Sequence, residues 1–128
     1  MVVPFLNYHG QCEEAIGFYE KIFTITNKKV QKFGDMPGVP ENMKNYILHA
    51  ELELNGQPFW FGDSPGEVTE GTMITISVTY QDPEKVTEVF NTLLEGGSVL
   101  IELSPKPYSP MHGCVKDKFG IGWQILAR

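Results

Sequence analysis

A stripe of apolar side chains appears twice in this chain, 71 residues apart, and this repeat limits the folds that the chain can adopt. In residues 11–24 the apolar positions follow the three-and-four spacing of an amphipathic helix. The same positions are apolar again in the second copy, in the pairs Ala15/Val86, Phe18/Val89, Tyr19/Phe90, Ile22/Leu93 and Phe23/Leu94. The segments before them, residues 2–8 and 73–79, also correspond. The sequence therefore predicts a strand followed by a helix, used twice.

Three further strands follow each predicted helix. They are residues 27–33, 46–54 and 58–61 in the first half, and residues 98–103, 112–116 and 122–126 in the second half. Asn55-Gly56 is a strong hairpin signal, and Asp82-Pro83 is a typical helix start. Loops are predicted at residues 34–45, which are rich in Gly, Pro and Asn, and at residues 104–110, which hold three prolines.

These elements predict an α+β fold made of two βαβββ modules. The modules are residues 1–62 and 72–128, and a polar linker, residues 63–71, joins them. A chain of 128 residues normally forms one domain, so we expect both modules to belong to the same one.

Composition excludes several classes of protein. The net charge of −6 and the lack of a Lys/Arg run argue against nucleic acid or an anionic membrane as a partner. No apolar stretch approaches the roughly 20 residues that span a bilayer, and the first ten residues do not resemble a signal peptide. Cys12 and Cys114 do not make a disulfide framework. The expected location is therefore the cytoplasm.

Alternation along two of the predicted strands leaves a polar face in each module. In residues 46–54 one face holds Tyr46, Leu48, Ala50, Leu52 and Leu54, and the other holds Ile47, His49, Glu51 and Glu53. In residues 73–80 Ile74, Ile76 and Val78 oppose Thr75, Ser77 and Thr79. We expect the two sheets to curve and turn their polar faces toward each other around a cleft, a usual place for a small molecule. The alternative is a solvated sheet face.

Paired strand–helix–three-strand modules resemble the vicinal oxygen chelate superfamily, which includes glyoxalase I, extradiol dioxygenases and the fosfomycin and bleomycin resistance proteins. Within it the chain is similar to the PhnB-like branch. The motifs are PFLNYHGQCEEAIGFYEKIF, ILHAELELNGQPFWFGDS and VKDKFGIGWQI, and the last is the most specific. The resemblance covers nearly the whole chain and implies a homodimer. One fold hosts many chemistries, so it does not settle the activity.

The resemblance also implies a divalent metal, held by His and Glu on the first and last strand of each module, that acts as a Lewis acid. Carried over to this sequence, these positions are Pro4, Thr75, Gln124 and a residue near Trp60. Proline cannot ligate through its side chain, and the other three are poor ligands. We therefore predict that the usual metal site is absent and that no cofactor is bound.

Other residues could carry chemistry in that setting. His49 with Glu51, or Glu102 with His112, could form an unorthodox metal site, although hydrogen-bonded cleft residues are the simpler interpretation. Glu51 or Glu53 could act as a general base. Trp60 could stack on a planar ligand, or simply pack. The loop of residues 34–45 could be a lid, or a mobile surface loop.

Cys12 lies in the first turn of the first predicted helix, where the helix dipole can lower the pKa of a thiol. A small packed cysteine is the alternative.

The function that fits best is the binding of a small organic molecule without the usual metal. The expected ligand-binding residues are His49, Glu51, Trp60, Thr75, Ser77 and Gln124. The alternative is a metal-dependent lyase, isomerase or dioxygenase with unorthodox ligands. Some relatives carry the name of a ubiquinone methyltransferase, but no strand here leads into a glycine-rich turn that would cradle a nucleotide-like cofactor.

Overall fold

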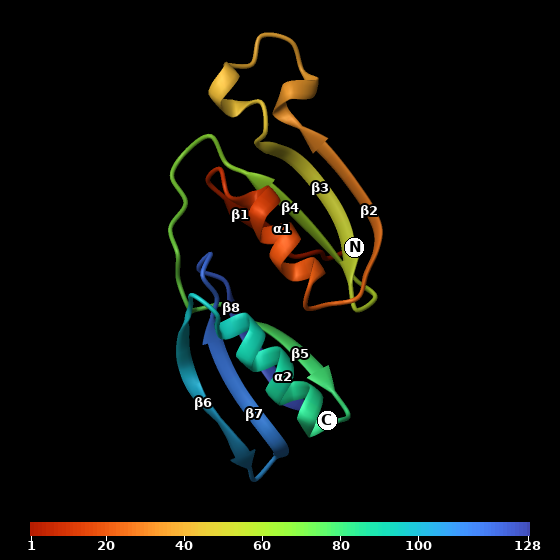
Figure 1. The fold of residues 1–128 in the computed structure, drawn as a ribbon, viewed down its shortest axis with the longest axis vertical. Helices are drawn as coiled ribbons and strands as arrows, with labels where there is room; N and C mark the ends of the chain where they lie inside the picture. Colours follow the sequence, from red (N-terminus) through yellow and green to blue (C-terminus); the bar gives the residue numbers. More distant parts are fainter. The chain divides into compact units, whose positions relative to one another are not determined.

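The computed structural model describes residues 1–128, which form two compact units, Met1–Val68 and Thr69–Arg128. Each unit is built as strand, helix and three strands (Figure 1), so the predicted α+β fold with two βαβββ modules is confirmed. The first unit contains β1 (Phe5–Tyr8), α1 (Cys12–Glu20), β2 (Ile25–Lys32), two 3₁₀ turns η1 (Phe33–Asp35) and η2 (Glu41–Met43), β3 (Ile47–Leu54) and β4 (Gln57–Asp63). The second contains β5 (Ile76–Tyr80), α2 (Pro83–Leu94), β6 (Ser98–Lys106), β7 (Ser109–Lys116) and β8 (Gly122–Ala127).

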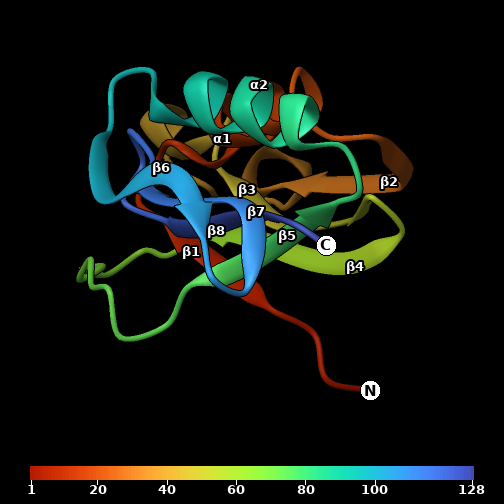
Figure 2. The ribbon, with the colours of Figure 1, turned by 90° about the horizontal axis from the view of Figure 1, so that it is seen from below.

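The two sheets have the same topology. Their strand orders are β1-β4-β3-β2 and β5-β8-β7-β6, with the first strand of each unit parallel to the last and the remaining pairs antiparallel. One helix covers one face of each sheet (Figure 2). The opposite, helix-free face of each sheet is where polar side chains gather. Neither helix is long and apolar enough to cross a bilayer.

The apolar stripes of the two helices are confirmed. Ala15 and its counterpart Val86 are fully buried. The other residues of the repeated pairs are buried as well, except Leu94, which is half-buried. Burying such a stripe is what stabilises a short amphipathic helix. The predicted start of α2 is also confirmed, because the Asp82 side chain accepts a hydrogen bond from the Glu84 N–H at 2.9 Å.

The repeat is shifted by one residue in the first strands. Leu6 and Tyr8 are buried, whereas Ser77 and Thr79, their counterparts at an offset of 71, are exposed. An offset of 72 restores the match and places Tyr8 and Tyr80 at the ends of β1 and β5. The shift arises because residues 9–11 connect β1 to α1, whereas only residues 81–82 connect β5 to α2. A shift of one residue exchanges the two faces of a strand.

Two predicted face assignments are wrong. The strand expected over residues 73–80 begins only at Ile76, and the Ile74 side chain is 82% exposed rather than packed on the apolar face. Ile47 is only 1% exposed and does not share the polar face. The register passes from Gln31↔His49 to Lys32↔Ile47, so Leu48 is an extra residue that reverses the alternation, as β-bulges do.

Residues 104–110 are also not the loop that their prolines predicted. β6 continues to Lys106, β7 begins at Ser109, and these two residues pair across a short turn. Pro105 is tolerated because β6 is an edge strand, where a missing N–H need not break a ladder. This hairpin brings Tyr108 next to the strand that carries His112.

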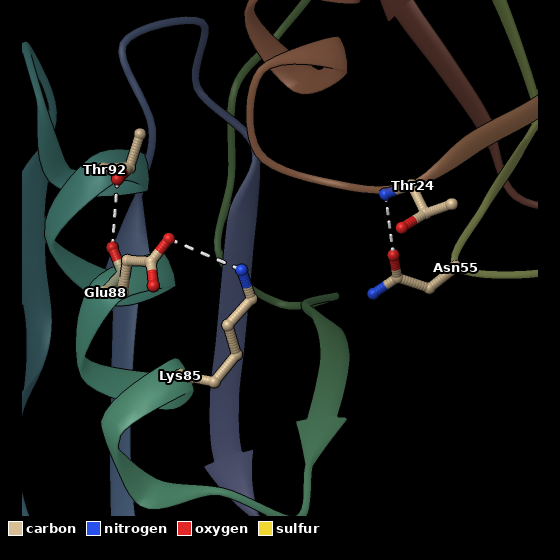
Figure 3. Close-up of polar contacts among 5 residues, drawn as sticks. All are labelled: Thr24, Asn55, Lys85, Glu88 and Thr92. Carbon is tan, nitrogen blue, oxygen red and sulfur yellow. Dashed lines mark hydrogen bonds and ion pairs between the residues drawn. The ribbon is translucent and has the colours of Figure 1, made fainter.

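Local polar contacts support a connection of the first unit and the helix of the second unit (Figure 3). The Thr24 N–H donates to Asn55 Oδ1 at 3.0 Å, and the Asn55 N–H donates back to the Thr24 carbonyl at 2.9 Å. Asn55 and Gly56 both have positive φ, 50° and 85°, which confirms the predicted hairpin turn. On α2, Lys85 Nζ pairs with Glu88 at 3.4 Å and the Thr92 hydroxyl donates to the Glu88 carbonyl at 3.0 Å.

Candidate ligand-binding faces

The helix-free face of the first unit carries an aromatic and acidic cluster. Phe5, Trp60 and Glu51 lie side by side on β1, β4 and β3 in consecutive register pairs. The His49 ring lies against both aromatic rings, with centroid distances of 5.8 Å to Phe5 and 5.4 Å to Trp60. His49 Nε2 is 3.1 Å from Glu51 Oε2. The structure therefore brings the predicted residues His49, Glu51 and Trp60 together on one surface.

A hollow of about 210 Å³ opens beside this cluster. Trp60, Glu51 and Glu53 line it, with Pro58 and Lys29 among the other lining residues. The Glu53 carboxylate is held in place by the Thr26 hydroxyl at 2.7 Å and the Asn27 amide at 2.8 Å. The His49 and Glu51 side chains remain 35% and 46% exposed, so their polar atoms are accessible to a ligand.

The equivalent face of the second unit carries a hydrogen-bonded chain of side chains that contains no carboxylate. Ser77, Gln124 and Cys114 lie side by side on β5, β8 and β7. These register pairs match Phe5, Trp60 and Glu51 in the first unit, and by the same registers His112 takes the place of His49. Each helix-free face therefore has one histidine at the same position of the fold.

His112 is 7% exposed and lies between two partners. Its Nδ1 is 2.6 Å from the Tyr108 hydroxyl, and its Nε2 is 2.6 Å from Gln124 Oε1. The Gln124 amide nitrogen then donates to Thr75 Oγ1 at 3.3 Å. The structure thus joins the predicted residues Thr75 and Gln124, with Ser77 beside Gln124 in the register, through a chain that begins at Tyr108.

The sequence interpretation missed the Tyr108–His112 pair as part of this face. It placed His112 at a strand start beside a proline loop and considered Glu102 as its neighbour. No hydrogen bond or ion pair joins Glu102 to His112, whose polar partners are Tyr108 and Gln124. Reading residues 104–110 as a hairpin on an edge strand would have revealed the pair, because such a turn returns Tyr108 toward the start of the next strand.

Cys12 is packed rather than reactive. Its side chain is fully buried, and this burial, together with the carboxylates of Asp63 and Glu13, raises the pKa of the Cys12 thiol. Asp63 stands at the end of β4, where its Oδ1 accepts the N–H groups of Gly10 at 2.7 Å and Cys12 at 3.1 Å. The positive end of α1 is therefore occupied by a carboxylate of the chain itself.

The donor set on these faces does not fit the metal that the superfamily implies. The one-residue shift removes Pro4 and Thr75 as equivalents, since the facing first-strand positions are Phe5 and Ser77. Together with Trp60 and Gln124 these positions offer no strong ligand for a divalent metal. No three side chains of the His, Cys, Asp or Glu type lie grouped so that they could hold a metal ion.

The loop of residues 34–45 contains the turn η2 and all of η1 except its first residue, Phe33. Backbone hydrogen bonds join the two ends of this loop: the Phe33 N–H donates to the Tyr46 carbonyl at 2.9 Å, and the Gly34 N–H donates to the Lys44 carbonyl at 3.1 Å. A lid function for this loop stays a prediction.

Comparison with known proteins gives consistent relatives. The family described as 3-demethylubiquinone-9 3-methyltransferase matches residues 1–126. A structure of a putative 3-demethylubiquinone-9 3-methyltransferase, PhnB protein, from Bacillus cereus is 30% identical, with 99% of this chain and 98% of that chain covered and a TM-score of 0.82. Protein PA1353 from Pseudomonas aeruginosa is 28% identical over 100% of this chain and 97% of its own, with a TM-score of 0.86.

Two further proteins are similar to this chain at lower sequence identity. Protein YjdN from Escherichia coli (strain K12) is 25% identical over 134 residues, 95% of this chain and 91% of that protein. The fosfomycin resistance protein FosX from Listeria monocytogenes shares the fold at 12% identity, with 99% of this chain and 91% of that chain covered and a TM-score of 0.71.

Proposed function

Because this chain belongs to the 3-demethylubiquinone-9 3-methyltransferase family and is similar to a PhnB protein, we propose that it binds a small organic molecule on the helix-free faces of its sheets. The observation that supports this most is the cluster of His49, Trp60 and Glu51 beside a hollow of about 210 Å³. Sites for small molecules combine apolar and aromatic surface with a few fixed polar groups.

The chemistry of the cluster matches a planar ligand. The half-buried Trp60 ring can stack on a flat apolar group, and the contact between His49 and Glu51 offers a polar pair at the edge of the same surface. In this proposal Trp60 supplies most of the affinity, whereas His49 and Glu51 orient the ligand.

A library of small aromatic compounds tests the proposal, with binding followed by chemical-shift changes in the full chain. We expect Trp60→Leu to weaken the compounds that bind by about tenfold, close to the ~1.4 kcal/mol that a lost stacking contact represents. Tyr46→Leu is the matched control, because it removes an aromatic ring of the same unit that lies beside Gly10, outside the cluster. An affinity that Trp60→Leu leaves unchanged would remove Trp60 from the site.

A metal-dependent enzyme is the second candidate, supported by the His49–Glu51 pair, which places one nitrogen and one carboxylate donor within 3.1 Å. A related FosX structure is described as complexed with Mn(II). Metal content of protein purified without an affinity tag or chelator, followed by titration with zinc, nickel and manganese, distinguishes the candidates. Stoichiometric metal binding that is lost in His49→Ala would favour the metal-dependent enzyme over the binding protein.

Methyl transfer, which the family description names, has less support. The N–H groups at the start of α1 bind Asp63, and the start of α2 is capped by Asp82. Each helix start therefore already faces a carboxylate of the chain, which disfavours an anionic group of a cofactor there. Titration of S-adenosylmethionine into the full chain is the direct test of this alternative, and saturable binding would revive it.

The proposal also includes a homodimer in the cytoplasm. Family resemblance supports the dimer, and the free thiols of Cys12 and Cys114 suit a reducing compartment. Light scattering coupled to size-exclusion chromatography measures the mass in solution, and a monomer at micromolar concentration would remove the dimer from the proposal.

A further inference from the structure

We propose that the helix-free face of the second unit recognises an oxyanion of a small organic acid, through the Thr75 hydroxyl. This inference rests on the proposed small-molecule binding and adds the chemical class that the face accepts. Its basis is the hydrogen-bonded chain from Tyr108 through His112 and Gln124 to Thr75.

The direction of each hydrogen bond in this chain follows from one group that can only accept, the amide oxygen of Gln124. Gln124 Oε1 can only accept, so His112 Nε2, at 2.6 Å, must carry the proton. In the neutral imidazole Nδ1 is then an acceptor, and the Tyr108 hydroxyl at 2.6 Å donates to it. With its oxygen turned to His112, the Gln124 amide directs its nitrogen to Thr75 Oγ1, 3.3 Å away.

Thr75 therefore accepts from within the protein and keeps its own hydroxyl proton for an outside partner. A second proton of the Gln124 amide remains beside it. Two donors without a facing acceptor select a ligand oxygen. A ligand that instead donated to Thr75 could use only the second lone pair of Oγ1, and it would leave the Thr75 hydroxyl proton and the second Gln124 amide proton without an acceptor.

Packing holds the Thr75 side chain in place. A Cβ built on Gly122 would lie 2.9 Å from the Thr75 methyl carbon, so the methyl group rests directly on the glycine. This contact fixes the orientation of the hydroxyl without using a polar group.

The two helix-free faces differ in their carboxylates, as recognition of an anion by the second unit requires. Alternation on β5, β7 and β8 leaves hydroxyl, amide, imidazole and thiol groups and one lysine on this face, and none of these positions is a carboxylate. They are Ser77, Thr79, His112, Cys114, Lys116 and Gln124, together with the apolar Leu126, and Thr75 lies directly before β5. The corresponding face of the first unit carries Glu51 and Glu53. Glu70, which precedes β5, brings one carboxylate to this unit's face, and Lys116 Nζ pairs with it at 3.5 Å. The three strands themselves present no carboxylate to an anionic group, which favours an acid over an amine.

Three probes with the same ring and different head groups test the class: benzoate, benzyl alcohol and benzylammonium. We expect benzoate to shift the backbone resonances of Thr75 and Gln124 at lower concentration than the other two, and Thr75→Val to weaken benzoate at least tenfold. Thr75→Ser, which keeps the hydroxyl, should restore most of the affinity. Thr79→Val is the matched control, because it removes an exposed hydroxyl on β5, four residues after Thr75, that takes no part in this chain of hydrogen bonds.

Two further variants test the direction of the hydrogen bonds. Gln124→Glu gives Thr75 an acceptor inside the protein and adds a negative charge, so benzoate affinity should fall by more than in Thr75→Val. Tyr108→Phe removes the first donor from a side chain that is 67% exposed and should not disturb folding. Tyr108 is a positioning residue, so this variant should change the nitrogen-15 shifts of the His112 ring and weaken benzoate modestly.

The outcomes separate this inference from the proposed function. Equal binding of the three probes, or benzoate binding that Thr75→Val leaves intact, overturns the oxyanion assignment even when Trp60-dependent ligands are found. Selective, Thr75-dependent benzoate binding supports it even when the aromatic library yields no Trp60-dependent compound, in which case only the proposal for the first unit fails.

Discussion

At the scale of single residues, the Asp63 side chain joins three segments of the first unit. It is 5% exposed and accepts three backbone N–H groups: Gly10 and Cys12 at one oxygen, and Ile47 at the other, 2.8 Å away. Asp63→Asn replaces one acceptor by an NH₂ group that must face a donor. We expect the free energy of unfolding to fall by about 1–3 kcal/mol, the cost of an unsatisfied buried group, measured by urea denaturation.

Asp35→Asn is the matched control for this substitution. Asp35 is exposed and accepts a single N–H, from Lys32 at 3.0 Å, which an asparagine oxygen can still accept. We expect its effect to stay within about 0.5 kcal/mol, as for most surface changes. Equal effects of the two substitutions would contradict the role given to Asp63.

The buried Cys12 thiol predicts a pH dependence of stability. Burial and neighbouring carboxylates raise the pKa of Cys12 in the folded chain, whereas the thiol of the unfolded chain ionises near pH ~8.5. Above that pH the unfolded chain loses a proton that the folded chain keeps, so stability falls as the pH rises, by up to about 1.4 kcal/mol per pH unit.

Urea denaturation from pH 7.5 to pH 10 measures this effect in the wild-type chain and in Cys12→Ala. The variant should lose less stability over the alkaline range, because of the two thiols only that of Cys114, whose pKa burial also raises, still contributes. Parallel curves for the two proteins would show that Cys12 ionises equally in both states.

At the scale of elements, the sequence correctly predicted the features that local periodicity and turn chemistry determine. The predicted strand faces were wrong where one additional residue changes the register. The apolar stripe of each helix, the Asp82 cap and the Asn55-Gly56 turn follow from local chemistry and are confirmed. The bulge at Leu48 could not be predicted, because it depends on pairing with β2. It is the reason that Ile47 is buried while His49 remains on the helix-free face.

Two glycine substitutions should have opposite effects on their elements. Gly17 lies within α1, and a Cβ there would meet nothing within 4 Å. Gly17→Ala should therefore stabilise the chain by up to about 1 kcal/mol, since glycine weakens a helix interior. Gly113 faces α2, and a Cβ there would lie 2.5 Å from the Phe90 ring.

Gly113→Ala should therefore destabilise the chain by about 1–3 kcal/mol, as overpacking of a core does. Thermal unfolding of both variants, compared with the wild type, measures the difference in sign. Destabilisation by Gly17→Ala would mean that α1 needs the open space beside Gly17 for a contact made in solution.

At the scale of the whole molecule, the duplication could be recognised from the sequence, but the two faces that it produces could not be compared. The registers show His49 and His112 at equivalent positions with different neighbours: an aromatic and acidic set in one unit, neutral donors in the other. Of the predicted site residues, the structure groups His49 with Glu51 and Trp60, and Thr75 with Gln124. The sequence did not predict a role for Tyr108, because the three prolines of residues 104–110 indicated a loop where the structure has a hairpin.

The two tryptophans, one in each unit, allow these environments to be measured in the intact chain. Trp123 is fully buried and its indole N–H donates to Asp117 at 2.9 Å, whereas Trp60 is half-buried on a helix-free face. We expect Trp60→Phe to remove the longer-wavelength part of the fluorescence and leave emission that acrylamide quenches several-fold less. Quenching that Trp60→Phe does not change would mean that the Trp60 ring is covered in solution, and a ligand could not stack on it without first displacing that cover.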